Sequence, residues 1–483
     1  MESNWINAGG IIPSGWQLVP LKALLLNDKA ISVGVMYPGE HLDGGVPLIK
    51  VGDVTNGEIL KTPDSRISFL VDEEYKRTRL VGNELLITLV GNPGECVIVE
   101  PHMEGWNAAR ALAVLRFKDP EIRYWLKLII QSKPSRHIID SRLNTTVQKT
   151  LNLKDVKELP ILMPPEKIRD NLCCYYYRLE NKATLNRQIN QTLEQMAQAL
   201  FKSWFVDFDP VVDNALDAGF FEQDLEFPDE LLCRAEARKA VRESADFKPL
   251  PEDIRQLFPA AFEKCSEPSL GLGGWVPEEW KNVAIYSLAD FVNGAAYKAF
   301  EPNQEQRGLP IIKIAELKAG VTFQTAFSDR DMPEKYRLKT GDILFSWSGN
   351  PDTSIDTFIW THGDAWLNQH IFKITPPNGP GERSFVLMAL KYLKPIFAEI
   401  ARNKQTTGLG HVTIADLKRL QIVKPEPRVL AAWDSVVNPY VNQAFTLTQQ
   451  AQTLANLRDA LLPNLISGKL RLDEIEKLLV EEI

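Results

Sequence analysis

The stretch Glu84-Leu85-Leu86-Ile87, closely followed by Gly91-Asn92-Pro93, has a second copy 258 residues further along the chain, at Asp342-Ile343-Leu344-Phe345 and Gly349-Asn350-Pro351. Four more pairs of segments repeat in the same order, with offsets of 261 to 264 residues: Pro13-x-x-Trp16 and Pro277-x-x-Trp280, Pro47–Val51 and Pro310–Ile314, Thr145-Thr146 and Thr406-Thr407, and Leu193–Leu200 and Leu454–Leu461. Five ordered matches with nearly constant offsets indicate a tandem duplication, so both halves should share one fold.

Each copy begins with a part of normal domain size. Short β-rich runs such as Val46–Val51 and Leu85–Val90 alternate with helical pieces such as Tyr124–Ser132, and Pro, Gly and Asn turns separate them. The fold class predicted for this part is therefore α/β in the broad sense, a mixed α+β domain. Trp16 and Trp280, at equivalent positions of the two copies, are expected to anchor the cores.

Each copy ends with a long amphipathic helix. The first is expected from Glu166, directly after Pro164-Pro165, and no Pro or Gly interrupts it before Pro210. Its apolar or small positions recur mostly every three or four residues: Leu172, Tyr176, Leu179, Ala183, Ile189, Leu193, Met196, Leu200 and Trp204. The second helix follows Pro427, with Pro439 making it less regular near its start, and has a similar stripe: Leu430, Trp433, Val437, Ala444, Leu447, Ala451, Leu454, Leu461 and Leu465. Forty helical residues reach roughly 60 Å.

Two such stripes have to be buried, and the other helix is the favoured partner. The prediction is an antiparallel coiled coil that places the two globular domains at opposite ends, related by a pseudo-two-fold axis. The alternative is that each helix packs only on its own domain.

The charge is unevenly distributed. The 483 residues have a formal net charge of −8, but residues 206–271 alone hold 7 basic and 16 acidic residues, whereas residues 272–425 hold 18 and 16. The two large parts, residues 1–164 and 272–425, are neutral and weakly positive respectively, which permits contact with DNA. The five cysteines include no CxxC pair, which fits reduced thiols. Since there is no apolar run of about 18 residues and no apolar signal core, the expected location is the cytoplasm.

Two stretches resemble the specificity subunit (HsdS) of type I restriction–modification enzymes. Thr192-Leu193-Glu194-Gln195-Met196-Ala197-Gln198-Ala199-Leu200-Phe201-Lys202-Ser203-Trp204-Phe205-Val206-Asp207-Phe208-Asp209-Pro210 is similar to that family's central helix, and Leu461-Leu462-Pro463-Asn464-Leu465-Ile466-Ser467-Gly468-Lys469-Leu470 to its distal helix. The Pro-x-x-Trp openings and Thr-Thr pairs resemble its target-recognition domains. The resemblance covers the chain in this order: recognition domain 1–164, central helix 165–206, acidic linker or insert 207–271, recognition domain 272–425, distal helix 426–470 and tail 471–483. It does not explain the centre of the acidic segment.

The resemblance implies a concrete role. Each recognition domain would read one half of a split, asymmetric DNA target, and the helix pair would set the spacing between the halves. Two modification subunits would dock on the helices and methylate adenine with S-adenosylmethionine, and restriction subunits would cleave DNA with ATP and Mg. This chain would bind no cofactor and would not itself be an enzyme.

The residues themselves agree with this role. Two domains on a strut can contact major grooves about one helical turn apart, ~34–36 Å. The segment Asn144–Lys149 stands against Gln405–Gly410 in the repeat register, and the two differ, which predicts unlike half-sites and a non-palindromic target.

Motifs for an enzyme are absent from the sequence. It contains no GxxxxGK[ST] phosphate loop, no [DNS]PP[YFW] methylase motif and no HExxH, and its six histidines show no metal spacing with cysteine. The run Asp72–Lys76 contains a Glu-x-Lys that a nuclease could use, but a solvated acidic turn is the favoured interpretation. Two rival functions stay open: a single-chain nuclease or methylase, and a coiled-coil scaffold without a DNA function.

The candidate contacts with DNA are residue types that bind base edges or phosphates, and they lie in duplicated loops or interrupt apolar segments. The DNA candidates are Lys50, Asn92, Arg110, Asn144, Thr145, Thr146 and Lys149 in the first domain, and Tyr297, Lys298, Lys313, Asn350, Gln369, Gln405 and Thr407 in the second. The candidates for binding partner subunits are Leu193, Met196, Leu200, Trp204, Leu454, Leu457 and Leu461. For each DNA candidate the alternative is a structural turn or a satisfied hydrogen bond.

Overall fold

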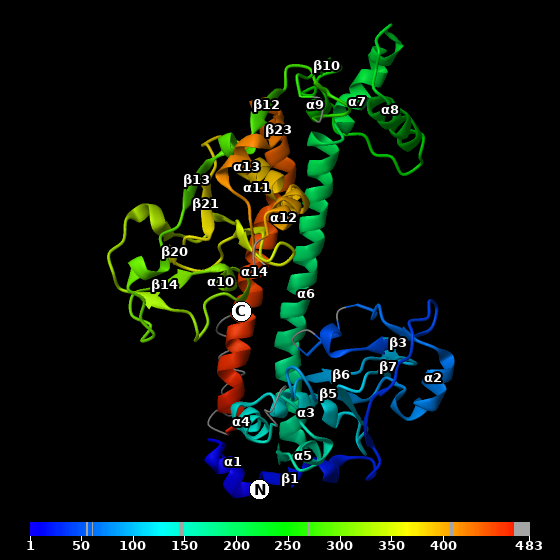
Figure 1. The fold of residues 1–483 in the computed structure, drawn as a ribbon, viewed down its shortest axis with the longest axis vertical. Helices are drawn as coiled ribbons and strands as arrows, with labels where there is room; N and C mark the ends of the chain where they lie inside the picture. Colours follow the sequence, from blue (N-terminus) through cyan, green and yellow to red (C-terminus); the bar gives the residue numbers. More distant parts are fainter. Residues whose placement is uncertain (55–56, 60, 144–148, 268–269, 406–408, 468–483) are drawn as a thin grey trace. The chain divides into compact units, whose positions relative to one another are not determined.

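The computed structural model describes residues 1–54, 57–59, 61–143, 149–267, 270–405 and 409–467 (Figure 1). The chain divides into two compact units. The first comprises Met1–Ala183 together with the chain from Thr453 onward, and the second comprises Thr184–Gln452. Each unit thus holds one sheet-bearing domain and one part of each long helix.

The first unit is built on two small sheets. A four-stranded antiparallel sheet has the order β2-β8-β5-β6, a three-stranded sheet has the order β4-β3-β7, and β1 pairs with β9. The strands are β1 (Gln17–Pro20), β2 (Ile31–Val33), β3 (Val46–Ile49), β4 (Arg66–Ile67), β5 (Leu85–Thr88), β6 (Cys96–Ile98), β7 (Asn107–Ala108), β8 (Leu112–Leu115) and β9 (Pro160–Met163). The helices are α1 (Glu2–Asn7), α2 (Phe69–Glu74), α3 (Ile122–Ile130), α4 (Lys133–Ser141) and α5 (Leu153–Lys157). Every residue of β5 is buried, which places this strand at the centre of the core.

The second unit repeats this architecture. Its four-stranded antiparallel sheet has the order β13-β21-β17-β19, a second sheet has the order β15-β14-β20-β16, and β12 pairs with β23 as β1 does with β9. The strands are β12 (Lys281–Ala284), β13 (Asp290–Asn293), β14 (Leu309–Ile312), β15 (Phe327–Ser328), β16 (Arg337–Leu338), β17 (Ile343–Ser346), β18 (Ser348–Gly349), β19 (Asp356–Ile359), β20 (Ala365–Leu367), β21 (Ile371–Thr375), β22 (Gly410–His411) and β23 (Gln421–Lys424). The helices are α10 (Ile314–Ala319), α11 (Glu382–Tyr392), α12 (Lys394–Asn403) and α13 (Ile414–Arg419). The tandem duplication and the mixed α/β class are confirmed. Trp280 is buried as predicted, and half-buried Trp16 packs on the first core.

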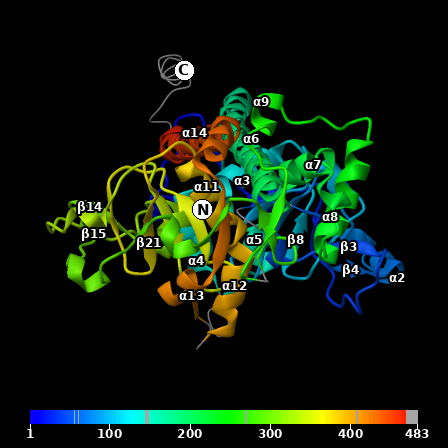
Figure 2. The same cartoon turned by 90° about the horizontal axis from the view of Figure 1, so that it is seen from above.

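The long helices α6 (Glu166–Phe205) and α14 (Pro427–Ile466) run antiparallel within each unit. In the second unit Asn190 Nδ2 donates to Thr448 Oγ1 at 2.8 Å, while Trp204, further along α6, meets Trp433, earlier in α14, at a ring-centroid distance of 5.7 Å. The two helices lie side by side in Figures 1 and 2. The antiparallel pair is thus confirmed, and Pro439 does not interrupt α14.

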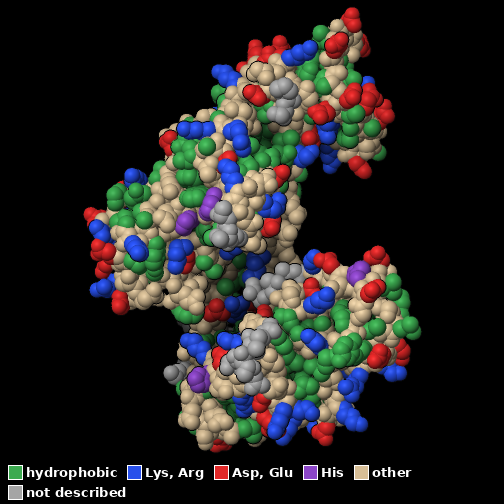
Figure 3. Space-filling model, viewed as in Figure 1, with side chains coloured by type: hydrophobic (Ala, Val, Ile, Leu, Met, Phe, Trp, Pro, Cys, Tyr) green, Lys and Arg blue, Asp and Glu red, His purple; other side chains and the backbone are tan. Residues whose placement is uncertain are grey.

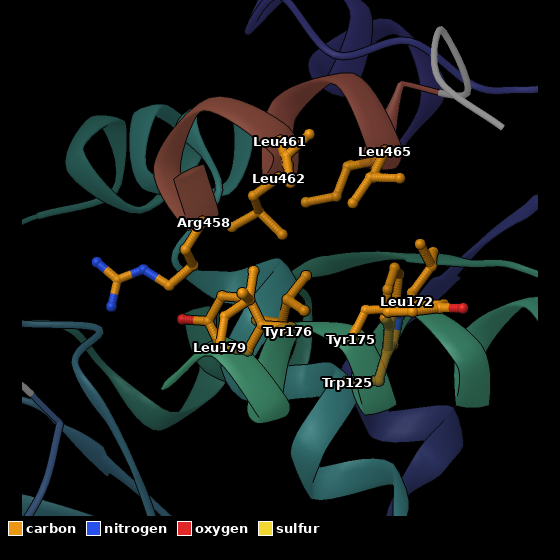
Figure 4. Close-up of a pocket in the computed structure, with 11 residues that line it drawn as sticks. Trp125, Leu172, Tyr175, Tyr176, Leu179, Arg458, Leu461, Leu462 and Leu465 are labelled. Carbon is orange, nitrogen blue, oxygen red and sulfur yellow. The ribbon is translucent and has the colours of Figure 1, made fainter. Parts of the chain in front are cut away.

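In the first unit the helix pair encloses an apolar pocket. Arg458 of α14 forms an ion pair with Glu180 of α6 at the edge of this contact. The pocket is lined from α3, α6 and α14, as Figure 4 shows, chiefly by Trp125, Leu172, Tyr175, Tyr176, Leu179, Leu461, Leu462 and Leu465. Tyr177 Oη also donates to the Tyr124 carbonyl oxygen at 3.1 Å. The helices therefore pack on each other as well as on a domain, so the alternative in which each helix packs only on its own domain is wrong. The position of the domains at opposite ends stays a prediction.

The acidic segment is folded. It contains α7 (Asp209–Asp217), α8 (Asp229–Arg242), α9 (Glu252–Arg255) and β10 (Phe262–Lys264), which pairs with β11 (Trp275–Pro277). Three carboxylates spaced four residues apart on α7 face three arginines with the same spacing on α8, in these pairs: Asp209 with Arg234, Asp213 with Arg238, and Asp217 with Arg242. Acidic side chains gather on the outer surface (Figure 3). The segment shares the second unit's core through Phe208 and Phe262, so of the two descriptions, linker or insert, it resembles a folded insert.

Candidate nucleic-acid interface

A pair of parallel strands positions two of the predicted contacts in the first domain. β3 pairs with β7 in parallel, and the Ala109 N–H continues the ladder by donating to the Ile49 carbonyl at 2.8 Å. Lys50 follows β3 directly and Arg110 lies two residues after β7. Because β3 and β7 are parallel, their carboxyl ends meet at one edge, and the backbone positions of these two exposed cations lie at that edge. The backbone N–H of Lys50 donates to Asp53 Oδ2 at 2.7 Å, which turns the chain away from the strand.

The second domain builds the same edge. β14 and β20 are parallel, and the Asn368 N–H donates to the Ile312 carbonyl at 3.2 Å. Lys313 and Gln369 therefore occupy the positions of Lys50 and Arg110. The Lys313 N–H bonds Glu316 Oε2 at 3.0 Å, as Lys50 bonds Asp53, and the Lys313 Nζ lies 5.1 Å from the centroid of the Tyr297 ring.

A glycine lets a third segment approach both edges. A Cβ on Gly34 would lie 2.0 Å from the Ala108 carbonyl oxygen, and a Cβ on Gly294 would lie 2.1 Å from the Asn368 carbonyl oxygen. No side chain fits at either position, since both distances are far inside van der Waals contact. The same close approach in both domains shows that this part of the scaffold is duplicated closely.

The two Gly-Asn-Pro turns lie beside the lysines. A Cβ on Gly91 would be 3.5 Å from Val51, next to Lys50, and one on Gly349 would be 3.7 Å from Ile314, next to Lys313. Both asparagines are exposed, but they also serve their own turns. Asn92 Nδ2 donates to Glu95 Oε2 at 3.1 Å, and Asn350 Oδ1 accepts from the backbone N–H groups of Asp352 and Thr353 at 3.0 and 3.1 Å.

The fourth segment at each edge follows α4 or α12. Val90 forms a bridge with Thr150, so exposed Lys149 is next to the first turn, and β18 pairs with β22 in the same way. Exposed Gln405 follows α12, whose Arg402 contacts Asp352 at 2.8 Å. Asn144, Thr145, Thr146 and Thr407 lie outside the described residues. We call Lys50, Asn92, Arg110 and Lys149 the first edge, and Lys313, Asn350, Gln369 and Gln405 the second edge.

The predicted partner contacts do not form one surface. Trp204 is only 2% exposed and packs against Phe205, Phe258 and Trp433, and Leu193 is also buried, so assigning these two as partner contacts is wrong. Leu200, Leu454, Leu457 and Leu461 are half-buried, and Leu461 lines the pocket of Figure 4. Met196, at 43% exposure, is the candidate that α6 leaves open.

Asp72 also differs from its predicted environment. It is 4% exposed, forms an ion pair with Arg79, and its Oδ1 accepts from Asn107 Nδ2 at 2.9 Å. This carboxylate supports the β7 strand and is not part of a solvated turn. Its surroundings give no support to a nuclease site.

The second edge has two histidines that the sequence did not single out. His370 follows Gln369, and its Nε2 lies 3.2 Å from the Gln369 side-chain nitrogen. His411 Nδ1 lies 2.9 Å from Ser348 Oγ. Burial, assisted by the neighbouring His411, lowers the pKa of His370 below its usual value of 6.5, so this imidazole is neutral at pH 7. The sequence signal that could have identified these two histidines is that the first copy has other residue types at the equivalent positions.

Two other kinds of site are absent from the described ranges. No group of three or more His, Cys, Asp or Glu side chains could hold a metal ion there. Across these same residues, no helix is both long and apolar enough to cross a membrane.

The geometry defines a class of protein: a duplicated pair of domains, each presenting one equivalent polar edge, combined with two antiparallel helices. Residues 277–427 match the family model described as the type I restriction modification DNA specificity domain. The chain is 24% identical to the type I restriction enzyme HindI specificity subunit of Haemophilus influenzae, covering 88% of this chain and 94% of that protein. It is 23% identical to the MjaIX specificity subunit of Methanocaldococcus jannaschii, with 96% of both chains covered.

Comparison of solved structures supports the fold. The type I restriction–modification S subunit from M. genitalium aligns with a TM-score of 0.51 at 12% identity, over 93% of this chain and 96% of that one. The chain is therefore a homologue of type I restriction enzyme specificity subunits, and the family predicted from the sequence is confirmed. Both relatives are specificity subunits of type I restriction enzymes.

Proposed function

We propose that this chain reads a bipartite, asymmetric DNA site, with each domain contacting one half. The observation that carries the proposal is the pair of edges: one backbone arrangement, repeated in both domains, presents Lys50 and Arg110 in the first and Lys313 and Gln369 in the second. The shared backbone would orient both domains on DNA in the same way. The different side chains at the equivalent positions Arg110 and Gln369 would then recognise different bases.

The chemistry of these positions divides into two roles. The two lysines occupy the same place in both domains, which suits contact with a phosphate, since phosphate contacts position a protein without reading sequence. Arginine pairs best with the guanine O6/N7 edge, whereas glutamine pairs with the adenine N6/N7 edge. Arg110 and Gln369 would therefore select different bases, and the two half-sites would differ.

The partners belong to the same proposal. Modification subunits would dock on α6 and α14, and S-adenosylmethionine, ATP and Mg would be used by the modification and restriction subunits. Met196 is the exposed α6 candidate for such a contact. Because the chain's net charge of −8 supplies little attraction for phosphates, high-affinity binding of duplex DNA would need the modification subunit.

The test is a pair of matched substitutions in the complex with the modification subunit. Arg110→Ala should relax selectivity in one half-site only, and Gln369→Ala should relax it in the other, each by roughly 1–3 kcal/mol of discrimination. Lys281→Ala, an exposed position of β12 that is neither an edge residue nor a candidate contact, serves as a control. If both variants changed the same half-site, the assignment of one half to each domain would be wrong.

A further inference from the structure

Equivalent backbone hydrogen bonds in the two domains identify a place where the side chains of the two copies differ. The Leu89 N–H donates to the Ala111 carbonyl at 2.8 Å, and in the second domain the Trp347 N–H donates to the His370 carbonyl at 3.4 Å. Trp347 therefore stands where the first domain has Leu89, and His370 where it has Ala111.

A third position changes with these two. The Leu151 N–H donates to the Leu89 carbonyl at 2.8 Å, and the Val412 N–H donates to the Trp347 carbonyl at 2.9 Å. This correspondence sets His411 against Thr150. One indole and two imidazoles thus replace Leu, Ala and Thr on the same backbone frame.

The three rings form one cluster. The Trp347 ring contacts both imidazoles, with centroid distances of 5.6 Å to His370 and 5.8 Å to His411. Its Nε1 donates to Asn293 Oδ1 at 3.0 Å, and its inner side packs on Phe372 at 5.8 Å. The indole is therefore held in a fixed orientation, and all three rings are half-buried and half open to solvent.

The cluster reaches the second edge through Gln369. The Gln369 side-chain nitrogen lies 3.2 Å from His370 Nε2, so the imidazole fixes the amide that the proposed function assigns to base recognition. His411 uses Nδ1 toward Ser348 Oγ, and its Nε2 has no bonding partner among the described residues.

Packing does not explain why these residues are present. The first domain completes the same strands with Leu89, Ala111 and Thr150, so the fold needs neither imidazole. Placing the His370 imidazole where the first domain has apolar Ala111 is unfavourable for stability unless its polar atoms are used. His370 Nδ1 is buried and, within the described part of the chain, has no hydrogen-bond partner. Such an arrangement is typical of a site that binds something.

We propose that Trp347, His370 and His411 form a specificity-determining site that only the second domain has, and that its ligand is duplex DNA of the second half-site. His411 contacts the DNA through Nε2, while Trp347 and His370 are positioning residues that hold His411 and Gln369. This inference rests on the proposed function, because it assigns new residues to the same interface.

The central experiment converts the cluster to the residues of the first domain, with the triple variant W347L/H370A/H411T in complex with the modification subunit. Discrimination between the cognate second half-site and single-base variants of it should fall roughly five- to a hundredfold, the range for loss of one good base contact. Recognition of the first half-site should not change. His362→Ala is the matched control, since it removes a histidine of the second unit that belongs to a different contact, with Trp360.

A merely structural role is separated by two further readouts. His411→Thr alone keeps a side chain that the fold accepts at this position, and it should lose discrimination at an unchanged thermal midpoint. His411→Gln, which keeps an N–H donor near Nε2, should restore part of the discrimination. If the triple variant does not fold, these two single variants decide the question.

The outcomes also separate this inference from the proposed function. Should a folded triple variant, or His411→Thr, discriminate as well as the unchanged protein in both half-sites, the cluster has no part in specificity and the inference is overturned. Should the unchanged complex show no bipartite selectivity at all, the proposed function itself fails.

Discussion

Lengthening both long helices by seven residues tests whether they set the spacing of the DNA site. Asn190 Nδ2 and Thr448 Oγ1 form a hydrogen bond of 2.8 Å, so these residues mark one level of the helix pair in the second unit. We would duplicate residues 184–190 in α6 and residues 448–454 in α14, which keeps the chain's own apolar spacing in both inserts.

The size of the effect follows from helix geometry. Seven residues at 1.5 Å each lengthen the connection between the two units by about 10 Å. They return the apolar stripe to within about 20° of its original direction, so the helices can still pair. At 3.4 Å per base pair along a strand, the spacer of the recognised site should grow by about three base pairs.

The assay is methylation mapping of a host that expresses the lengthened chain with its modification subunit. We expect the two half-sites to be unchanged and the spacer to be longer by about three base pairs. A control with the insert in α6 alone should destabilise the protein, because it shifts the α6 residues out of register with α14. An active complex with an unchanged spacer, or with altered half-sites, would refute the view that the helices act as a ruler.

Four further outcomes are expected. Trp204→Ala should lower the free energy of unfolding by about 3–5 kcal/mol in chemical denaturation, because it empties a buried aromatic position, and a loss below 1 kcal/mol would contradict the packing. Arg238→Ala should lower the free energy of unfolding by about 1–3 kcal/mol, because it leaves the Asp213 carboxylate without its ion-pair partner between α7 and α8. An unchanged melting curve would argue that this ion pair does not stabilise the fold. Burial raises the pKa of the Cys96 thiol to about 12, so at pH 8 only about one molecule in 10⁴ carries a Cys96 thiolate. Mass spectrometry of the folded protein should therefore find alkylation at exposed Cys174 but not at Cys96. Cys96 should react only when the pH approaches 12 or the protein unfolds. Arg110→Ala should reduce the salt dependence of DNA binding by at most about one counterion, since its main loss should be in selectivity, and an equal loss of affinity for all sequences would make it a phosphate contact.

Much of the fold could be predicted from the sequence because the duplication provides its own comparison. The repeated Pro47–Val51 segment marks the strand that Lys50 follows, and the structure puts Lys313 at the same place in the second copy. The Pro164-Pro165 stop likewise marks the start of α6. These signals are local, since strands, turns and helix ends depend mainly on neighbouring residues.

What could not be predicted depends on contacts between distant segments. A long apolar stripe does not reveal which residues face a domain: Trp204 belongs to the stripe and is a plausible partner contact by sequence, yet it meets Phe258 and Trp433. A charge count over residues 206–271 does not show that Asp213 finds Arg238, 25 residues away. The histidine cluster is not apparent in the sequence for the same reason, because its rings come from three separate segments.

The most direct test of the central claim is single-molecule methylation sequencing of a host expressing this chain with its modification subunit, compared with the same host after deletion of the chain. We predict a split, asymmetric adenine-methylation motif that disappears with the deletion, and that changes in one half only when Gln369 is replaced. Methylation that persists without the chain, or a palindromic motif whose halves change together, would contradict the account.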